Sequence, residues 1–193
     1  MDLLTILIAA VFTHNIALTY FLGMCPFVAV SGNLRTAMGM SMAVTFVMSL
    51  AAAVTWPIYH KLLVPYDVTY LQYVVFILVI AALVQIVEMM VERTSPFLYN
   101  TMGVFLPLIT VNCAILGVTL FMVVRDYSYI ESLIYSFGSG IGWGVAILAM
   151  AAIRERLRFA DLPEGLKGAG ITMIIAGLMA MSFMGFAGIL NVH

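Results

Sequence analysis

Apolar residues form six long runs along the chain, and short polar segments separate them. The runs cover approximately Leu3–Val30, Thr36–Trp56, Tyr70–Val91, Phe97–Val124, Glu131–Ile153 and Gly168–Leu190. About 20 apolar residues in a helix cross a hydrocarbon core that is roughly 30 Å thick. The pattern therefore predicts an all-α integral membrane protein, with six transmembrane helices in a single membrane domain that spans residues 1–193.

The first and fourth runs are too long for one straight crossing. Each contains the helix-breaking residues proline and glycine around a cysteine: Gly23 and Pro26 flank Cys25, and Pro107 and Gly117 flank Cys113. Proline removes a backbone donor, and glycine loosens a helix. Freed backbone groups persist in a bilayer only where protein or a bound group satisfies them. We expect both runs to be pairs of half-helices that meet near the membrane midplane.

The composition supports the membrane assignment and excludes other classes. Hydrophobic residues make up 64% of the chain and charged residues 9%, whereas a soluble domain has about 25% charged residues. The net charge of −1 excludes a nucleic-acid protein, which needs a clustered basic face. No basic segment precedes the first run, so we expect no cleavable signal peptide.

The basic residues between the runs predict the orientation of the chain. One side has Lys61 and Arg125, and the other has Arg35, Arg93, Arg154, Arg156, Arg158 and Lys167. Basic residues accumulate on the cytoplasmic side of membrane proteins. The second side is therefore expected to be cytoplasmic, with both termini outside.

The order of the runs suggests an internal repeat. Each half, about 1–93 and 94–193, has one broken run followed by two regular ones. Three crossings per half give the halves opposite topology, and paired broken helices in such inverted repeats mark a functional site at the midplane. This relation is expected to bring Cys25 and Cys113 to a similar depth.

Two cysteines at equivalent breaks suggest a metal centre. Two thiolates cannot complete a four-cysteine iron–sulfur or zinc site, so a second polypeptide would have to supply the missing ligands. The competing interpretation is that both thiols are inert packing groups, as most buried cysteines are.

Other polar residues within the runs leave alternatives open. His14 is either a proton or cation relay or a histidine hydrogen-bonded to a neighbouring helix, and we favour the second. Asn112 is expected to bond a sulfur or a freed carbonyl. Gln85 and Glu88 share one helix face, and intramembrane carboxylates are functional candidates, although Glu88 also lies near the cytoplasmic end of its run.

Two further segments have structural interpretations. Gly138, Gly140, Gly142 and Gly144 predict close helix packing rather than a phosphate loop, which needs a lysine and a preceding strand. Arg154–Arg158 is expected to be a cytoplasmic anchor or a docking site for a soluble partner.

Several motifs resemble those of the RnfA/NqrE family. They are Phe21–Phe27, Thr94–Tyr99, Gly103–Ala114, Ile153–Arg156 and Ala176–Ala180. The stretch Leu106-Pro-Leu-Ile-Thr-Val-Asn-Cys113 is the most specific of them. The resemblance covers essentially the whole chain.

This resemblance implies that Cys25 and Cys113 ligate the iron of a [2Fe–2S] cluster inside the membrane. A homologous six-helix subunit of opposite topology, of the NqrD/RnfE type, would supply two further cysteines. The cluster would relay electrons between NADH-oxidising and flavin-bearing subunits, with FMN, riboflavin and FAD held outside this chain. The implied activity is that of a sodium-translocating NADH:quinone oxidoreductase in the bacterial inner membrane, with ubiquinone as acceptor and no complete active site in this chain alone.

The motifs do not all favour the same complex. Arg125–Tyr129, Gly138–Trp143 and Gly165–Thr172 resemble the quinone-reductase E-type subunit, whereas Cys25-Pro26 and Thr94–Pro96 resemble the A-type subunit of the Rnf ferredoxin:NAD+ oxidoreductase. We favour the E-type. Two other hypotheses stay open: a secondary cation transporter with an inverted repeat, and an assembly subunit whose cysteines only pack.

Overall fold

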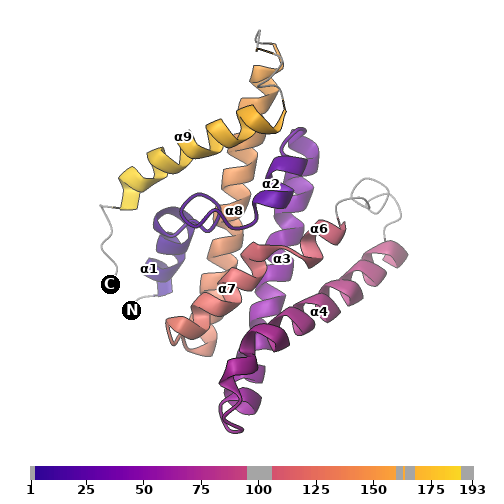
Figure 1. The fold of residues 1–193 in the computed structure, drawn as a ribbon, viewed down its shortest axis with the longest axis vertical. Coiled ribbons are helices and arrows are strands. Elements are labelled where there is room, and N and C mark those ends of the chain that lie inside the picture. The colour runs from indigo at the N-terminus through magenta and orange to yellow at the C-terminus, as the bar shows by residue number, and fades with distance from the viewer. Residues whose placement is uncertain (1–2, 95–105, 160–162, 164–167, 188–193) are drawn as a thin grey trace.

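A computed structural model describes residues 3–94, 106–159, 163 and 168–187 (Figure 1). All regular structure in these ranges is helical. The helices are α1 (Leu3–Ile8), η1 (Ala9–Thr13), α2 (Met24–Val30), α3 (Leu34–Ile58), η2 (Tyr59–Leu63), η3 (Thr69–Leu71), α4 (Gln72–Thr94), α6 (Leu106–Thr110), α7 (Cys113–Val124), α8 (Tyr129–Leu157) and α9 (Ala169–Ala187). The predicted all-α class is confirmed.

Within the described residues, three helical segments are long and apolar enough to cross a membrane. They are Leu34–Leu63, Thr69–Met90 and Tyr129–Leu157, and shorter apolar helices cover Leu3–Thr13, Leu108–Val124 and Ala169–Gly185. Each predicted run thus contains apolar helix, and the first and fourth are interrupted, as expected. Six crossings and the inverted repeat stay predictions. Lys167 and residues 95–96 of the boundary between the two halves lie outside the described residues.

The antiparallel pair of α3 and α8 forms the centre of the fold (Figure 1). Small residues make this close approach possible, because a Cβ on Gly140 would lie 2.8 Å from Thr45 Cα. On another face of α8, a Cβ on Gly142 would lie 2.9 Å from the Val11 carbonyl oxygen in η1. The glycine run is therefore a packing surface, as predicted from its spacing.

The remaining helices surround this pair. The helices α1 and η1 pack on α8, and α7 packs on α3. In Figure 1, α6 and α7 cross the face of the central pair, and α2 lies near the end at which α3 begins. This arrangement brings both interrupted segments to the same region of the molecule.

Candidate functional site at two helix breaks

The first helix break extends over residues 14–23, between the end of η1 and the start of α2. Asn15, which is fully buried, satisfies much of the freed backbone. Its Oδ1 accepts hydrogen bonds from the amides of Ala17 (3.1 Å) and Leu18 (3.4 Å). Its Nδ2 donates to the carbonyls of Val11 (3.1 Å) and Gly142 (2.8 Å). One side chain thus replaces several missing helical bonds and attaches the break to α8.

The second break is much shorter and lies between α6 and α7. Asn112 has an extended backbone conformation and caps α7, because its Oδ1 accepts a hydrogen bond of 3.0 Å from the Ala114 amide. Asparagine is a preferred residue at this position for that reason. The asparagine oxygen thus satisfies one of the amide donors that a helix N-terminus leaves unpaired. Its Nδ2, the atom that could donate to a sulfur or a freed carbonyl, has no partner among the described residues, so that expectation stays a prediction.

The two breaks meet at Gly23 and Cys113, which are separated by 90 residues in sequence. The Gly23 amide donates a hydrogen bond of 3.0 Å to Cys113 Sγ. Cys25 follows Gly23 by two residues and lies in the first turn of α2, while Cys113 is the first residue of α7. Both thiols are exposed and neither is in a disulfide. The structure therefore places both predicted site residues at one junction, where a neighbouring molecule can reach them.

Gly23 is necessary at this junction for two reasons. Its φ of 77° lies in the left-handed region, which other residues rarely adopt. A Cβ at this position would also lie 2.6 Å from Trp143 Nε1, 3.0 Å from the Ala114 side chain and 3.1 Å from Asn112 Oδ1. The absence of a side chain lets the first break contact both α7 and α8.

Arg154 fixes the other end of α2. Its Nη1 donates to the Val28 carbonyl (2.9 Å) and to Ser31 Oγ (2.7 Å), and Ser31 is fully buried. The guanidinium thus caps the C-terminus of the helix that contains Cys25, a position where positive charge is favourable. The sequence interpretation of Arg154 as part of a cytoplasmic anchor missed this contact, since no local motif indicates a partner on α2.

Arg125, in the turn between α7 and α8, is held by aromatic residues. Its Nη1 donates to Tyr127 Oη (3.2 Å), and its guanidinium lies 5.5 Å from the centroid of the Tyr135 ring. Burial alone would lower the pKa of Arg125, but the hydrogen bond to Tyr127 and the neighbouring tyrosines raise this pKa overall. Arg125 therefore keeps its positive charge at this end of the molecule.

The structure also describes the other polar candidates, His14, Gln85 and Glu88. The His14 amide donates to the Ala9 carbonyl (2.7 Å) at the end of η1. Gln85 is exposed and Glu88 is half-buried on α4. In the described part of the chain, no group of three or more His, Cys, Asp or Glu side chains is placed to hold a metal ion.

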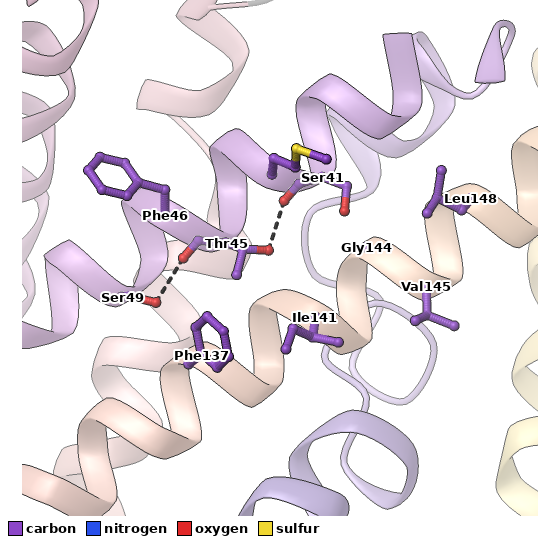
Figure 2. Close-up of a pocket in the computed structure, with 10 residues that line it drawn as sticks. Ser41, Thr45, Phe46, Ser49, Phe137, Ile141, Gly144, Val145 and Leu148 are labelled. Atoms are coloured by element: carbon purple, nitrogen blue, oxygen red, sulfur yellow. Dashed lines mark hydrogen bonds between the residues drawn. The ribbon is translucent and has the colours of Figure 1, made fainter. Parts of the chain in front are cut away.

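A groove of about 510 Å³ lies between α3 and α8 (Figure 2). It is lined mainly by apolar side chains, among them Phe46, Phe137 and Ile141. The Thr45 hydroxyl donates to the Ser41 carbonyl (2.8 Å) and the Ser49 hydroxyl to the Thr45 carbonyl (2.9 Å). These two donors are satisfied by their own helix, so the groove presents mostly apolar surface.

Comparison with known protein families gives a match over nearly the whole chain. Residues 3–190 match the model of a family described as "Rnf-Nqr subunit, membrane protein". The chain belongs to the Rnf-Nqr family. The resemblance derived from the motifs is thus confirmed.

Curated relatives of this Rnf-Nqr chain carry two kinds of name. The chain is 50% identical over 188 residues to the A-type subunit of an ion-translocating oxidoreductase complex from Syntrophotalea carbinolica, covering 97% of both chains. It is 52% identical over 192 residues to the E-type subunit of the Na(+)-translocating NADH-quinone reductase from Aeromonas hydrophila, covering 96% of this chain and 97% of the relative. The E-type protein of the same name from Hahella chejuensis is also 52% identical over 196 residues, with the same coverage. Both types of relative are similar to this chain along nearly its whole length.

Proposed function

We propose that this chain is the transmembrane electron-relay subunit of an ion-translocating NADH oxidoreductase. The observation that carries the proposal is the junction of the two breaks, where the Gly23 amide binds Cys113 Sγ and Cys25 follows two residues later. The names of the relatives support an oxidoreductase complex. An insulating layer of roughly 30 Å requires an intermediate carrier if electrons are to cross it.

The carrier we propose is a [2Fe–2S] cluster shared between two subunits. Cys25 and Cys113 would provide two of four thiolate ligands, which is the number that such clusters need. The donor set of this chain fits this role, since both thiols are exposed at one junction and the described residues offer no third ligand nearby. A homologous subunit of opposite topology would provide the other two cysteines. The cluster supplies one-electron transfer when it is bound.

Residues of this chain hold the two breaks and their cysteines in position. Asn15 and Asn112 satisfy the backbone at the breaks, so both segments keep their irregular conformation in an apolar environment. The Gly23 amide donates to the Cys113 sulfur. Arg154 caps α2 and thereby limits the movement of Cys25 relative to α8.

The complex and its location follow from the same proposal. We favour the E-type subunit of a sodium-translocating NADH:quinone oxidoreductase in the bacterial inner membrane, on the basis of the motifs at Arg125–Tyr129 and Gly138–Trp143. The A-type subunit of an Rnf complex is the second candidate, since an A-type relative is 50% identical to this chain. Six crossings with both termini outside, in two inverted repeats, belong to this proposal, and the other subunits would hold FMN, riboflavin and FAD.

Replacement of a cysteine in the assembled complex tests the proposal. We expect Cys113→Ser to remove two irons per complex and one [2Fe–2S] signal in low-temperature EPR, while the flavins stay bound. Turnover should fall to background, because a hydroxyl is a poor iron ligand compared with a thiolate. Val111→Ala, at an exposed neighbouring position, is the matched control and should retain the iron. Unchanged iron and turnover in Cys113→Ser would reject the electron-relay role and favour a cation transporter.

A further inference from the structure

Two buried N–H donors at the cysteine junction have no hydrogen-bond partner within the described residues. They are Trp143 Nε1 and Asn112 Nδ2. The Trp143 side chain is completely buried, and Asn112 is 4% exposed. A buried donor without a partner keeps the cost of its lost hydration, and such groups are uncommon in native proteins. Two of them at one place therefore require an explanation.

Both donors belong to side chains that contact the Gly23 turn. A Cβ on Gly23 would lie 2.6 Å from Trp143 Nε1 and 3.1 Å from the Asn112 side chain. The amide of the same glycine is bonded to Cys113 Sγ. The indole ring occupies the space that any side chain at residue 23 would need. It thereby keeps the turn against α7, in the position that lets the amide reach the sulfur.

The position of Trp143 is itself well determined by packing. Its ring meets the Phe27 ring edge to face, with 6.5 Å between the centroids, and Phe27 is a fully buried residue of α2. The indole therefore contacts the helix that contains Cys25 as well as the turn that binds Cys113. Trp143 lies on α8, one of the two central helices. It therefore connects the segments that contain both cysteines with the buried centre of the fold.

N–H dipoles near a cluster thiolate have a defined electrostatic effect. Reduction adds negative charge to an iron–sulfur cluster, and hydrogen bonds to its sulfurs stabilise that charge and raise the reduction potential. The effect is larger in an apolar environment, where the local dielectric constant is low. The Gly23 amide, which donates to Cys113 Sγ, is placed to have this effect.

We propose that Trp143 is a positioning residue for Cys113, which holds the Gly23 amide on the sulfur and, together with the Asn112 amide, sets the reduction potential of the centre that Cys113 ligates. This inference rests on the proposed function, since it requires a cluster on Cys113. The competing interpretation is that Trp143 only fills the core. In that case phenylalanine would replace it with no effect on the potential, because the lost N–H has no partner among the described residues.

The test is a redox titration of the intact complex with Trp143→Phe, followed by EPR. We expect both irons and the [2Fe–2S] signal to be retained. The midpoint potential should become more negative, with about a tenfold lower ratio of reduced to oxidised cluster at a fixed ambient potential. For a one-electron couple this ratio corresponds to about 59 mV.

Trp56→Phe is a matched control, because Trp56 is the other tryptophan of the chain. Its Nε1 donates to the Tyr127 carbonyl (2.9 Å), outside the cysteine junction. This variant loses an indole N–H of the same kind and should leave the midpoint potential unchanged.

Asn112→Ser is a second, independent variant. Serine preserves the cap of α7 but removes the Nδ2 donor, so its midpoint potential should also become more negative. If Trp143→Phe does not assemble, the result with Asn112→Ser decides. An unchanged midpoint potential in the assembled variants would overturn the inference. Loss of iron from assembled Trp143→Phe would also overturn it, because the indole would then be needed only to keep the cluster bound.

Cys113→Ser distinguishes a failure of the proposed function from a failure of the role of Trp143 alone. If Cys113→Ser retains all iron, the proposed function and the inference both fail. If Cys113→Ser loses the cluster while Trp143→Phe and Asn112→Ser titrate like the wild type, only the inference fails.

Discussion

At the scale of single residues, Gly23 controls how two distant segments meet. Its left-handed conformation costs other residues about 1–2 kcal/mol, and a methyl group would also overlap Trp143 Nε1. We therefore expect Gly23→Ala to lower the iron content of the complex at least severalfold and the free energy of unfolding by about 1–3 kcal/mol. Iron analysis and thermal unfolding of the purified complex would measure both effects.

Gly32→Ala provides the control for this prediction. A Cβ on Gly32 would meet no atom within 4 Å, and its φ is not in the left-handed region. This variant should retain wild-type iron content and stability. Equal behaviour of the two alanine variants would show that the Gly23 turn does not determine the site.

The sequence identified the residues with distinctive chemistry but not their partners. Cys25, Cys113 and the neighbouring proline and glycine residues are recognisable because such residues are unusual within apolar runs. The roles of Asn15 and Arg154 depend on acceptors 127 and 126 residues away, respectively. No periodicity or local motif encodes such a pairing, so only the folded structure shows it.

At the scale of helices, the two breaks differ more than the sequence suggested. Both were predicted, but the first extends over residues 14–23 and the second over only 111–112. Glycine and proline mark where a helix can end. The length of the break depends on which groups replace the missing backbone hydrogen bonds of the helix. Asn15 supplies these bonds in the first break, and a single cap is sufficient in the second.

The short helix α2 depends on a cap from another helix. Arg154 provides both contacts at its C-terminus, and hydrogen bonds from charged donors contribute about 1.5–3 kcal/mol. We expect Arg154→Ala to increase hydrogen exchange of the α2 amides about tenfold or more, measured by mass spectrometry on the complex in nanodiscs. Arg156→Ala, at an exposed site on α8, the helix that contains Arg154, should leave hydrogen exchange in α2 unchanged. Similar exchange in both variants would contradict the capping role.

At the scale of the whole molecule, the chain has a well-packed centre and large apolar surfaces. The pair of α3 and α8 is tightly packed at Gly140, whereas residues such as Leu78 on α4 and Met181 on α9 are more than 60% exposed. Hydrocarbon or partner subunits cover surfaces of this kind in membrane complexes. The sequence predicted the apolar runs. Surfaces that contact lipid and surfaces that contact another subunit are equally apolar, so the pattern could not show which of the two covers each helix face.

The two exposed cysteines predict that the proposed cluster forms only in the complete assembly. Two thiols are half of the ligands of a [2Fe–2S] cluster, and the described residues contain no group of three ligands. The isolated chain, purified in detergent, is therefore expected to contain less than one tenth of the iron expected for a loaded cluster, and to gain two irons when it is co-expressed with the homologous subunit. Iron and acid-labile sulfide analysis would measure this. A fully loaded cluster in a preparation of this chain alone would contradict the proposed partner, because two copies would then have supplied all four thiolates.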